Sequence, residues 1–205
     1  KPLPKPDHRS LLRPIGPVAV FCASNFPFAY SVAGGDTASA LAAGCPVIVM
    51  GHHAHIGTAE IMGGLIVEAV KANHLPEGTF SLLMGEGRVI GQQVAKHPAL
   101  RAIGFTGSTR TGRRMLEYAS RSNLKRVYNE LGGKSAFLVF PDFGDLERAA
   151  VTVAGSMFFN QGESCNAPSR LYVQDSIKEK FLEKALALVP AYAPANPTLP
   201  DTVMG

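Results

Sequence analysis

Short apolar runs alternate with helical patterns over the first two thirds of the chain. The runs are bounded by glycine, proline or polar residues and have the length of buried strands; they lie at 16–21, 46–50, 79–84, 101–105 and 125–131. The segments between them carry helical patterns, at 30–43, 58–73, 88–96 and 111–120. This alternation predicts an α/β fold, in which a doubly wound, mostly parallel Rossmann-like sheet is covered on both faces.

The alternation starts again after Lys134, which predicts a second α/β unit. Strand runs at 135–140 and 170–173 are each followed by a helical pattern, at 145–161 and 176–188. We therefore expect two domains, at 1–134 and 135–205. The two ends of the chain, 1–14 and 190–205, are rich in proline and have no hydrophobic period, so we expect no packed element there.

Composition narrows the classes of function. Of the 205 residues, 46% are apolar, which is enough for a packed core, and 18% are charged, with a net charge of +4. Lys and Arg are scattered without interleaved aromatic residues, so we expect no nucleic-acid partner. The apolar runs are too short to span a bilayer, and three widely spaced cysteines indicate reduced thiols. A cytoplasmic protein without a membrane partner is expected.

One cysteine has a setting that suggests chemistry. Cys165 follows the helical pattern at 145–161 and the break at Gly162, instead of lying inside an apolar run. A thiol there can meet a substrate, but the negative end of the helix dipole disfavours its thiolate. A nucleophilic Cys165 would need a nearby base or a positive group on a bound cofactor. The hexapeptide 160–165 alone fits a half-buried cysteine without chemistry equally well.

Polar groups also stand where predicted parallel strands end. The turn 106–112 joins a strand to a helix and offers glycines to an approaching phosphate, although its spacing is not the dinucleotide fingerprint. Glu130 lies at the carboxyl end of a strand, where catalytic acids and bases collect. Asn25 follows the first strand, and its amide could donate a hydrogen bond to an oxyanion. Each of these residues also has a plainer interpretation as a turn residue.

Three histidines, His52, His53 and His55, crowd together after the second predicted strand. Their spacing does not match the helical spacing of zinc ligands, and the cysteines are remote in sequence, so we expect no metal site. A loop that meets an anionic ligand is the preferred interpretation.

Taken together, four segments resemble successive motifs of the aldehyde dehydrogenase superfamily, in the family's order. They are 23–28 (ASNFPF), 104–112 (GFTGSTRTG), 130–134 (ELGGK) and 161–165 (QGESC). The run 31–40 further resembles the α-ketoglutarate semialdehyde (2,5-dioxovalerate) dehydrogenase branch. Because members are more than twice as long, the resemblance implies a fragment: an N-terminally incomplete dinucleotide-binding domain followed by a truncated catalytic domain. It also implies a homo-oligomer at full length.

The resemblance implies NAD(P)-dependent oxidation of an aldehyde, such as the small acidic semialdehyde 2,5-dioxopentanoate, to the acid. Cys165 would be the nucleophile, Glu130 the general base, and Asn25 with the Cys165 N–H the oxyanion hole. The isolated 205-residue chain is expected to be inactive. The implied cofactor contacts are Ser24, Met50, His53, Gly85, Gly107, Ser108, Gly112, Leu131 and Gly132.

Two of these positions depart from the family pattern. Met50 stands where the family usually has a lysine that contacts the adenosine ribose, and His53 stands where NAD-preferring members often carry glutamate. A glutamate would repel the 2′-phosphate of NADP, whereas a histidine can donate to it. We therefore expect both cofactors to bind, with NADP preferred and the preference growing as pH falls.

Two other functions remain open. The chain could be a catalytically incomplete family fragment that only binds dinucleotide, or a cysteine acyl-transfer or hydrolase enzyme without nicotinamide. A hydrolase has no use for a phosphate-binding turn at 106–112, so that turn favours the two dinucleotide-binding alternatives.

Overall fold

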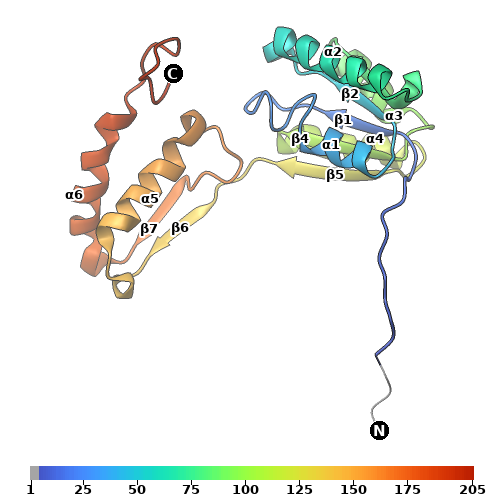
Figure 1. Ribbon diagram of the computed structural model, residues 1–205. Helices are drawn as coiled ribbons and strands as arrows, with labels where there is room; N and C mark the ends of the chain where they lie inside the picture. Colours follow the sequence, from blue (N-terminus) through green and yellow to red (C-terminus); the bar gives the residue numbers. More distant parts are fainter. Residues whose placement is uncertain (1–4) are drawn as a thin grey trace. The chain divides into compact units, whose positions relative to one another are not determined.

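The chain forms two compact α/β units, which divide between Glu130 and Leu131 (Figure 1). The structure, a computed structural model, describes residues 5–205. Residues 5–15 form neither helix nor strand and are exposed, as their lack of a hydrophobic period predicts; the first four residues of the predicted lead-in lie outside the described part. No helix among the described residues is both long enough and apolar enough to cross a membrane.

The first unit is built on a five-stranded parallel sheet, which confirms the predicted fold class. Its strands are β1 (Val18–Phe21), β2 (Val47–Met50), β3 (Phe80–Leu83), β4 (Ala102–Gly107) and β5 (Arg126–Leu131). Their order is β3-β2-β1-β4-β5, with Val20 of β1 opposite Val49 on one side and Gly104 on the other. After β1 the chain therefore adds β2 and β3 on one side of β1, and it then crosses back and adds β4 and β5 on the other side.

This reversal places helices on both faces of the sheet. The four helices are α1 (Gly35–Ala42), α2 (Ile56–Ala72), α3 (Gln92–Lys96) and α4 (Thr109–Ser120). Right-handed crossovers that run in opposite directions along a sheet lie on opposite faces, so α1 and α2 cover one face, and α3 and α4 the other. The core on the α1 face joins Val18, Val20 and Ala102 of the sheet to Leu41 and Ile66 of the helices.

Two predicted helices of this unit begin later than the sequence pattern indicates. The predicted helix 30–43 begins at Gly35, because residues 30–34 are folded into a turn against the chain after β1: Ala23 N–H donates to Tyr30 O at 2.9 Å. The pattern at 88–96 is a π-helical turn, Gly87–Gly91, followed by the short α3. At 30–34 this hydrogen bond, and at 87–91 a turn bounded by two glycines, outweigh the helical spacing of the apolar residues.

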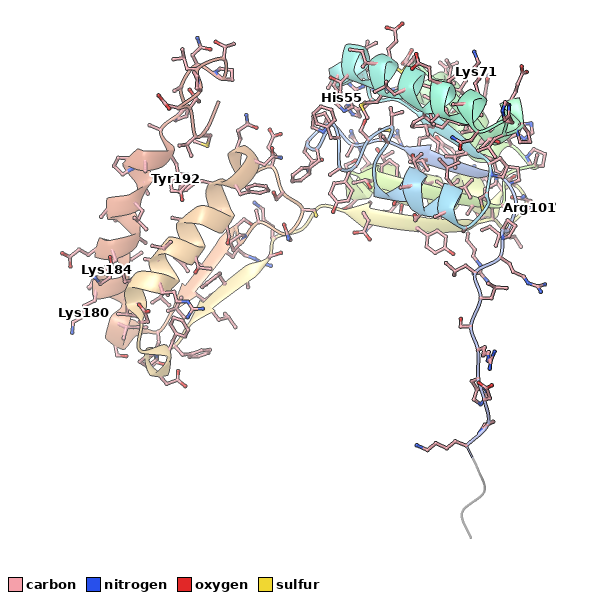
Figure 2. All side chains as sticks on the ribbon, in the orientation of Figure 1. His55, Lys71, Arg101, Lys180, Lys184 and Tyr192 are labelled. Carbon is pink, nitrogen blue, oxygen red and sulfur yellow. The ribbon has the colours of Figure 1, made fainter. Side chains whose placement is uncertain are left out.

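The second unit is a smaller α/β layer pair. Its strands β6 (Ala136–Val139) and β7 (Arg170–Val173) are parallel, and its helices are α5 (Leu146–Phe158) and α6 (Lys178–Leu188). Both helices lie on one face of the sheet, with Val139, Val153 and the fully buried Phe181 at the centre of the core. An ion pair between Lys184 and Glu147, 2.6 Å apart, joins the helices at the surface (Figure 2).

Within residues 131–205, all of which the structure describes, no helix covers the opposite face of this two-stranded sheet. Leu138, Phe140 and Tyr172 are 59%, 57% and 53% exposed, respectively. A hollow of about 500 Å³ opens beside β6 and the first turns of α5, lined mainly by aromatic and aliphatic side chains. This unit therefore leaves an apolar sheet face in contact with solvent.

Short helical turns connect the main elements. They are His53–His55, Glu77–Thr79, Pro141–Phe143, Phe159–Gly162, Asp175–Ile177 and Val189–Tyr192. The last of them opens the tail at 190–205, where Ala195 N–H donates to Met204 O at 2.9 Å. The tail is thus folded back on itself, although its sequence predicts no packed element.

Candidate active site

The predicted site residues of the first unit gather at one edge of its sheet. Parallel strands end at the same edge, and here each strand delivers at least one of these residues near its carboxyl end. They are Ser24 and Asn25 after β1, Met50 and His53 at the end of β2, Gly85 after β3, Gly107 and Ser108 at the end of β4, and Glu130 in β5. The strand order reverses between β1 and β4, so Asn25 and Ser108 flank the switch point, where sheets of this kind bind ligands.

The turn after β4 ends in a capped helix. Ser108 Oγ accepts a hydrogen bond from Thr111 N–H at 3.3 Å and donates to Thr111 Oγ1 at 3.1 Å, which fixes the first turn of α4. The first N–H groups of a helix have no partner within it and carry the positive end of its dipole. Ser108 is exposed, so this end of α4 is open to solvent, and its donor set fits a phosphate group.

One glycine of this turn, Gly107, has a packing reason for being glycine. A Cβ on Gly107 would lie 2.7 Å from Cζ of Phe105, which allows no side chain there without moving the ring. Gly112 is buried in α4 beneath β5, where its carbonyl accepts a hydrogen bond from the Asn129 amide at 3.4 Å. Gly107 thus leaves room for the Phe105 ring of β4, and Gly112 joins α4 to Asn129 of β5 through its carbonyl group.

The histidine cluster forms a network within the loop after β2. His52 Nδ1 accepts from Ala54 N–H at 3.1 Å, and the His52 and His53 rings stack with their centroids 4.3 Å apart. Burial, and then the charges of His53 and His55, lower the pKa of His52. His53 itself is exposed and open to a ligand.

His55 ties this loop to the loop after β1. Its Nε2 lies 2.8 Å from the carbonyl oxygen of Ala23, directly before Ser24 and Asn25 (Figure 2). A carbonyl can only accept, so Nε2 carries the hydrogen. The sequence pointed to His55 only as one of three histidines, because its partner is 32 positions away and leaves no local signal.

Met50 and Gly85 differ in what they can offer to a ligand. Met50 is 4% exposed and pairs with Phe21 of β1 and Leu83 of β3, and its side chain has no hydrogen to donate. Gly85 is exposed, with φ of +153°, and a Cβ there would collide with Cδ1 of Ile90. Its backbone is therefore the part that a ligand could reach.

Cys165 lies in an irregular loop between α5 and β7 in the second unit. The helix predicted over 145–161 ends earlier, at Phe158, because Asn160, Gln161 and Gly162 all have positive φ, at 51°, 58° and 74°. The expectation that Cys165 follows directly on a helix end is therefore wrong. A helix dipole acts mainly within the last turn, so its effect on a thiolate at Cys165 is smaller than the sequence implied.

The three thiols differ sharply in access. Cys165 is exposed, whereas Cys22 and Cys45 are buried. Burial, with a further contribution from the Asp36 carboxylate, raises the pKa of the Cys22 thiol to about 11, so Cys22 stays protonated near neutral pH.

The residues that follow Glu130 belong to the second unit and lie near the Cys165 loop. Leu131 is half-buried and Gly132 is exposed, while a Cβ on Gly133 would lie 3.4 Å from the Cys165 carbonyl oxygen. Gly133 and the Cys165 loop thus pack together within the second unit.

Known proteins are similar to nearly the whole of this chain. The chain is 43% identical over 198 residues to alpha-ketoglutaric semialdehyde dehydrogenase 2 of Azospirillum brasilense, covering 95% of this chain and 38% of that protein. It is 39% identical to the NADP/NAD-dependent aldehyde dehydrogenase PuuC of Escherichia coli, covering 94% of this chain and 38% of that protein. The chain therefore spans about 38% of the length of these relatives.

Solved structures show the same likeness. The indole-3-acetaldehyde dehydrogenase AldA of P. syringae, solved with NAD+, superposes with a TM-score of 0.83 at 36% identity, over 94% of this chain and 38% of that one. The family model described as the aldehyde dehydrogenase family matches residues 3–205. The chain belongs to the aldehyde dehydrogenase family.

Proposed function

We propose that the intact protein carrying this sequence oxidises an aldehyde to the carboxylic acid with NAD or NADP, as a cytoplasmic homo-oligomer. The observation that carries this proposal is the exposed thiol of Cys165, in a chain whose other two cysteines are buried. A family member needs one accessible nucleophile, and the open N-terminus of α4 at the switch point supplies a fitting place for a cofactor phosphate.

The Cys165 sulfur forms the covalent bond to the substrate. Its thiolate attacks the aldehyde carbon, and the resulting oxyanion accepts hydrogen bonds from the Asn25 amide and the Cys165 N–H. The bound nicotinamide supplies the hydride acceptor that this oxidation requires. Cys165 then holds the acyl group as a thioester.

Glu130 completes the cycle by activating water. Its carboxylate takes a proton from a water molecule, and the hydroxide oxygen attacks the thioester carbon. The carbon–sulfur bond breaks, the acid leaves, and Cys165 regains its thiolate. Ser108, the backbone at Gly107 and the first turn of α4 would hold the cofactor phosphate, and Ser24, Gly85, Leu131 and Gly132 contribute further contacts.

Two substitutions test the chemistry in the intact protein. Cys165→Ala is expected to abolish aldehyde-dependent formation of reduced nicotinamide, because no other group can hold the acyl intermediate. Glu130→Gln is expected to keep one pre-steady-state burst per active site and to lose later turnovers, since only the hydrolysis step needs the base. Cys45→Ala is the control, because Cys45 is buried before β2, at the amino edge of the sheet. Turnover by Cys165→Ala would overturn the proposal.

The substrate that we propose is a small aldehyde with a carboxylate, such as 2,5-dioxopentanoate. The support is the similarity to alpha-ketoglutaric semialdehyde dehydrogenase 2 at 43% identity. We expect a kcat/KM for 2,5-dioxopentanoate well above that for pentanal, which has the same chain length without the charge. Equal values for the two aldehydes would contradict this assignment.

For the cofactor, we propose that both dinucleotides bind and that NADP is preferred. The exposed His53 can donate to a 2′-phosphate, whereas a carboxylate at that position would repel it. Because a protonated imidazole attracts the phosphate more strongly, the preference should grow between about pH 8 and about pH 6. Binding of NAD and NADP is to be measured across this range with His53→Glu as the comparison. Tighter NAD binding by the unmutated protein at every pH would end the idea.

A further inference from the structure

The chain after β1 forms a loop that is closed on itself. Ala23 N–H donates to Tyr30 O at 2.9 Å, and Tyr30 N–H donates to Phe26 O at 3.2 Å. The rings of Phe26 and Tyr30 also meet edge to face, with their centroids 5.5 Å apart. Residues 23–30, which we name the Asn25 loop, are therefore one compact piece. A shift at one end of this loop moves Asn25 as well.

His55 bonds the Asn25 loop to the start of a long helix. Its Nε2 lies 2.8 Å from the carbonyl oxygen of Ala23, two residues before Asn25. His55 is the N-cap of α2, a helix of 17 residues that is anchored by buried side chains such as Ala59. Figure 2 shows His55 and Lys71 at opposite ends of this helix. A side chain at the end of a packed helix can hold a loop in place more precisely than the loop can hold itself.

The local setting of His55 does not favour the stability of α2. An N-cap side chain usually accepts a hydrogen bond from the first turn of its helix, but His55 makes no such bond. Its Nδ1 is buried and has no hydrogen-bond partner within residues 5–205, which costs stability. Both features indicate that the side chain serves its bond to Ala23 and not the helix.

We infer that His55 is a positioning residue for Asn25: its Nε2–H holds the Ala23 carbonyl group, and with it the Asn25 loop, at the carboxyl end of β1. The inference rests on the proposed role of Asn25 as a donor to the oxyanion. Such a donor acts only if it lies at hydrogen-bond distance from the atom on which the charge develops. A small displacement of the loop would therefore slow the step in which the oxyanion forms.

Two substitutions at position 55 differ in reach by one methylene group. The amide nitrogen of glutamine reaches about as far as Nε2 of histidine, so His55→Gln can still donate to the Ala23 carbonyl. The amide of asparagine reaches only as far as Nδ1, so His55→Asn loses this bond. Asparagine is also a favoured N-cap, and His55→Asn should therefore keep or raise the urea midpoint. A slower reaction in a variant that is no less stable cannot come from unfolding.

The test is the rate of the pre-steady-state burst of reduced nicotinamide in the intact protein. His55→Asn should lower this rate by about tenfold, and His55→Gln should restore most of it. Asn25→Ala should lower the rate by about 100-fold. Combining His55→Asn with Asn25→Ala should give a protein no slower than Asn25→Ala alone, since His55 acts through Asn25. Independent effects would multiply instead.

A second measurement needs no cofactor. Backbone amides of residues 23–30 should exchange with deuterium faster in His55→Asn than in the unmutated apoprotein, and in His55→Gln at the original rate. Amides of α2 should be unaffected in both variants. Equal burst rates in the two variants, multiplied effects in the double variant, or unchanged exchange of residues 23–30 would overturn the inference. An undiminished burst in Asn25→Ala would instead overturn the oxyanion role within the proposed function.

Discussion

At the scale of single residues, Asp36 stands out because its environment opposes its charge. It lies half-buried, and its pKa is raised by burial and by Glu130. A carboxyl group whose pKa is higher in the folded than in the unfolded protein stabilises the fold while it is protonated. This contribution is present below the ordinary pKa of aspartate and is lost as pH rises through the raised pKa.

We therefore expect Asp36→Asn to stabilise the protein more at pH 7 than at pH 4. Asparagine keeps the shape of the side chain but has no charge to desolvate. The measurement is the urea midpoint of the variant minus that of the unmutated protein, taken at both pH values. Glu68→Gln, whose carboxyl group is exposed, should show a difference that varies little with pH. A stabilisation by Asp36→Asn that is larger at pH 4 would contradict the expectation.

Single residues divide into those that the sequence could identify and those that it could not. Cys165, Glu130 and Asn25 could be proposed from the sequence because they stand in motifs with a family order, and their roles stay predictions. Asp36 and His55 were not, because their significance comes from partners at distant positions: Gly104 for Asp36 and Ala23 for His55. A glycine in the middle of a buried strand is the one local sign that something else fills its space.

Among the elements, the N-terminus of α4 has one side chain, Ser108, that both stabilises the helix and lies at the proposed phosphate site. Ser108 caps the helix through Thr111, and the same turn is the proposed phosphate site. Substitutions that keep or remove the cap, with or without a charge, can separate the two effects.

Ser108→Ala should lower the free energy of unfolding by about 1 kcal/mol, the usual value of an N-cap. Ser108→Asn should keep the cap and cofactor binding, because it adds no charge. Ser108→Asp should keep the cap and favour the helix dipole but weaken dinucleotide binding, since its carboxylate repels a phosphate. Urea unfolding and dinucleotide titration of the three variants provide the check. Unchanged dinucleotide affinity in Ser108→Asp would place the phosphate elsewhere.

The sequence pattern predicted the positions of the strands well, because burial alone decides them. The seven strand runs all form strands, since short apolar segments bounded by turns have few other places in an α/β fold. Helix ends were less predictable. The ends of α1 and α5 depend on a tertiary hydrogen bond at Tyr30 and on three left-handed residues at 160–162, neither of which alters the spacing of apolar residues.

At the scale of the whole molecule, the two units differ in how completely their sheets are covered. The five-stranded sheet has helices on both faces, whereas the β6-β7 sheet has helices on one face only. Leu138, Phe140 and Tyr172 are left on the open side. Exposed apolar patches of this kind favour association with other surfaces.

The 205-residue chain on its own is therefore expected to self-associate at micromolar concentrations. Replacing both Leu138 and Phe140 by Asp should reduce the association, because it places charges in the patch. Phe28→Asp, at a side chain that is 64% exposed in the first unit, is the control and should leave association unchanged. Light scattering during size-exclusion chromatography measures the mass. An equal effect of Phe28→Asp would mean that general solubility, and not this face, is responsible.

Because Cys165 is exposed and the other two cysteines are buried, the folded chain also has a natural site for labelling with a thiol reagent. A maleimide dye added to the folded chain should react with Cys165 and spare Cys22 and Cys45, which are shielded by the sheet and its helices. The dye would then report on the loop between α5 and β7 without any engineered cysteine. Unfolding in urea would expose the thiols of Cys22 and Cys45, so the number of dye labels per chain should rise from one to three. This number would measure the unfolded fraction directly.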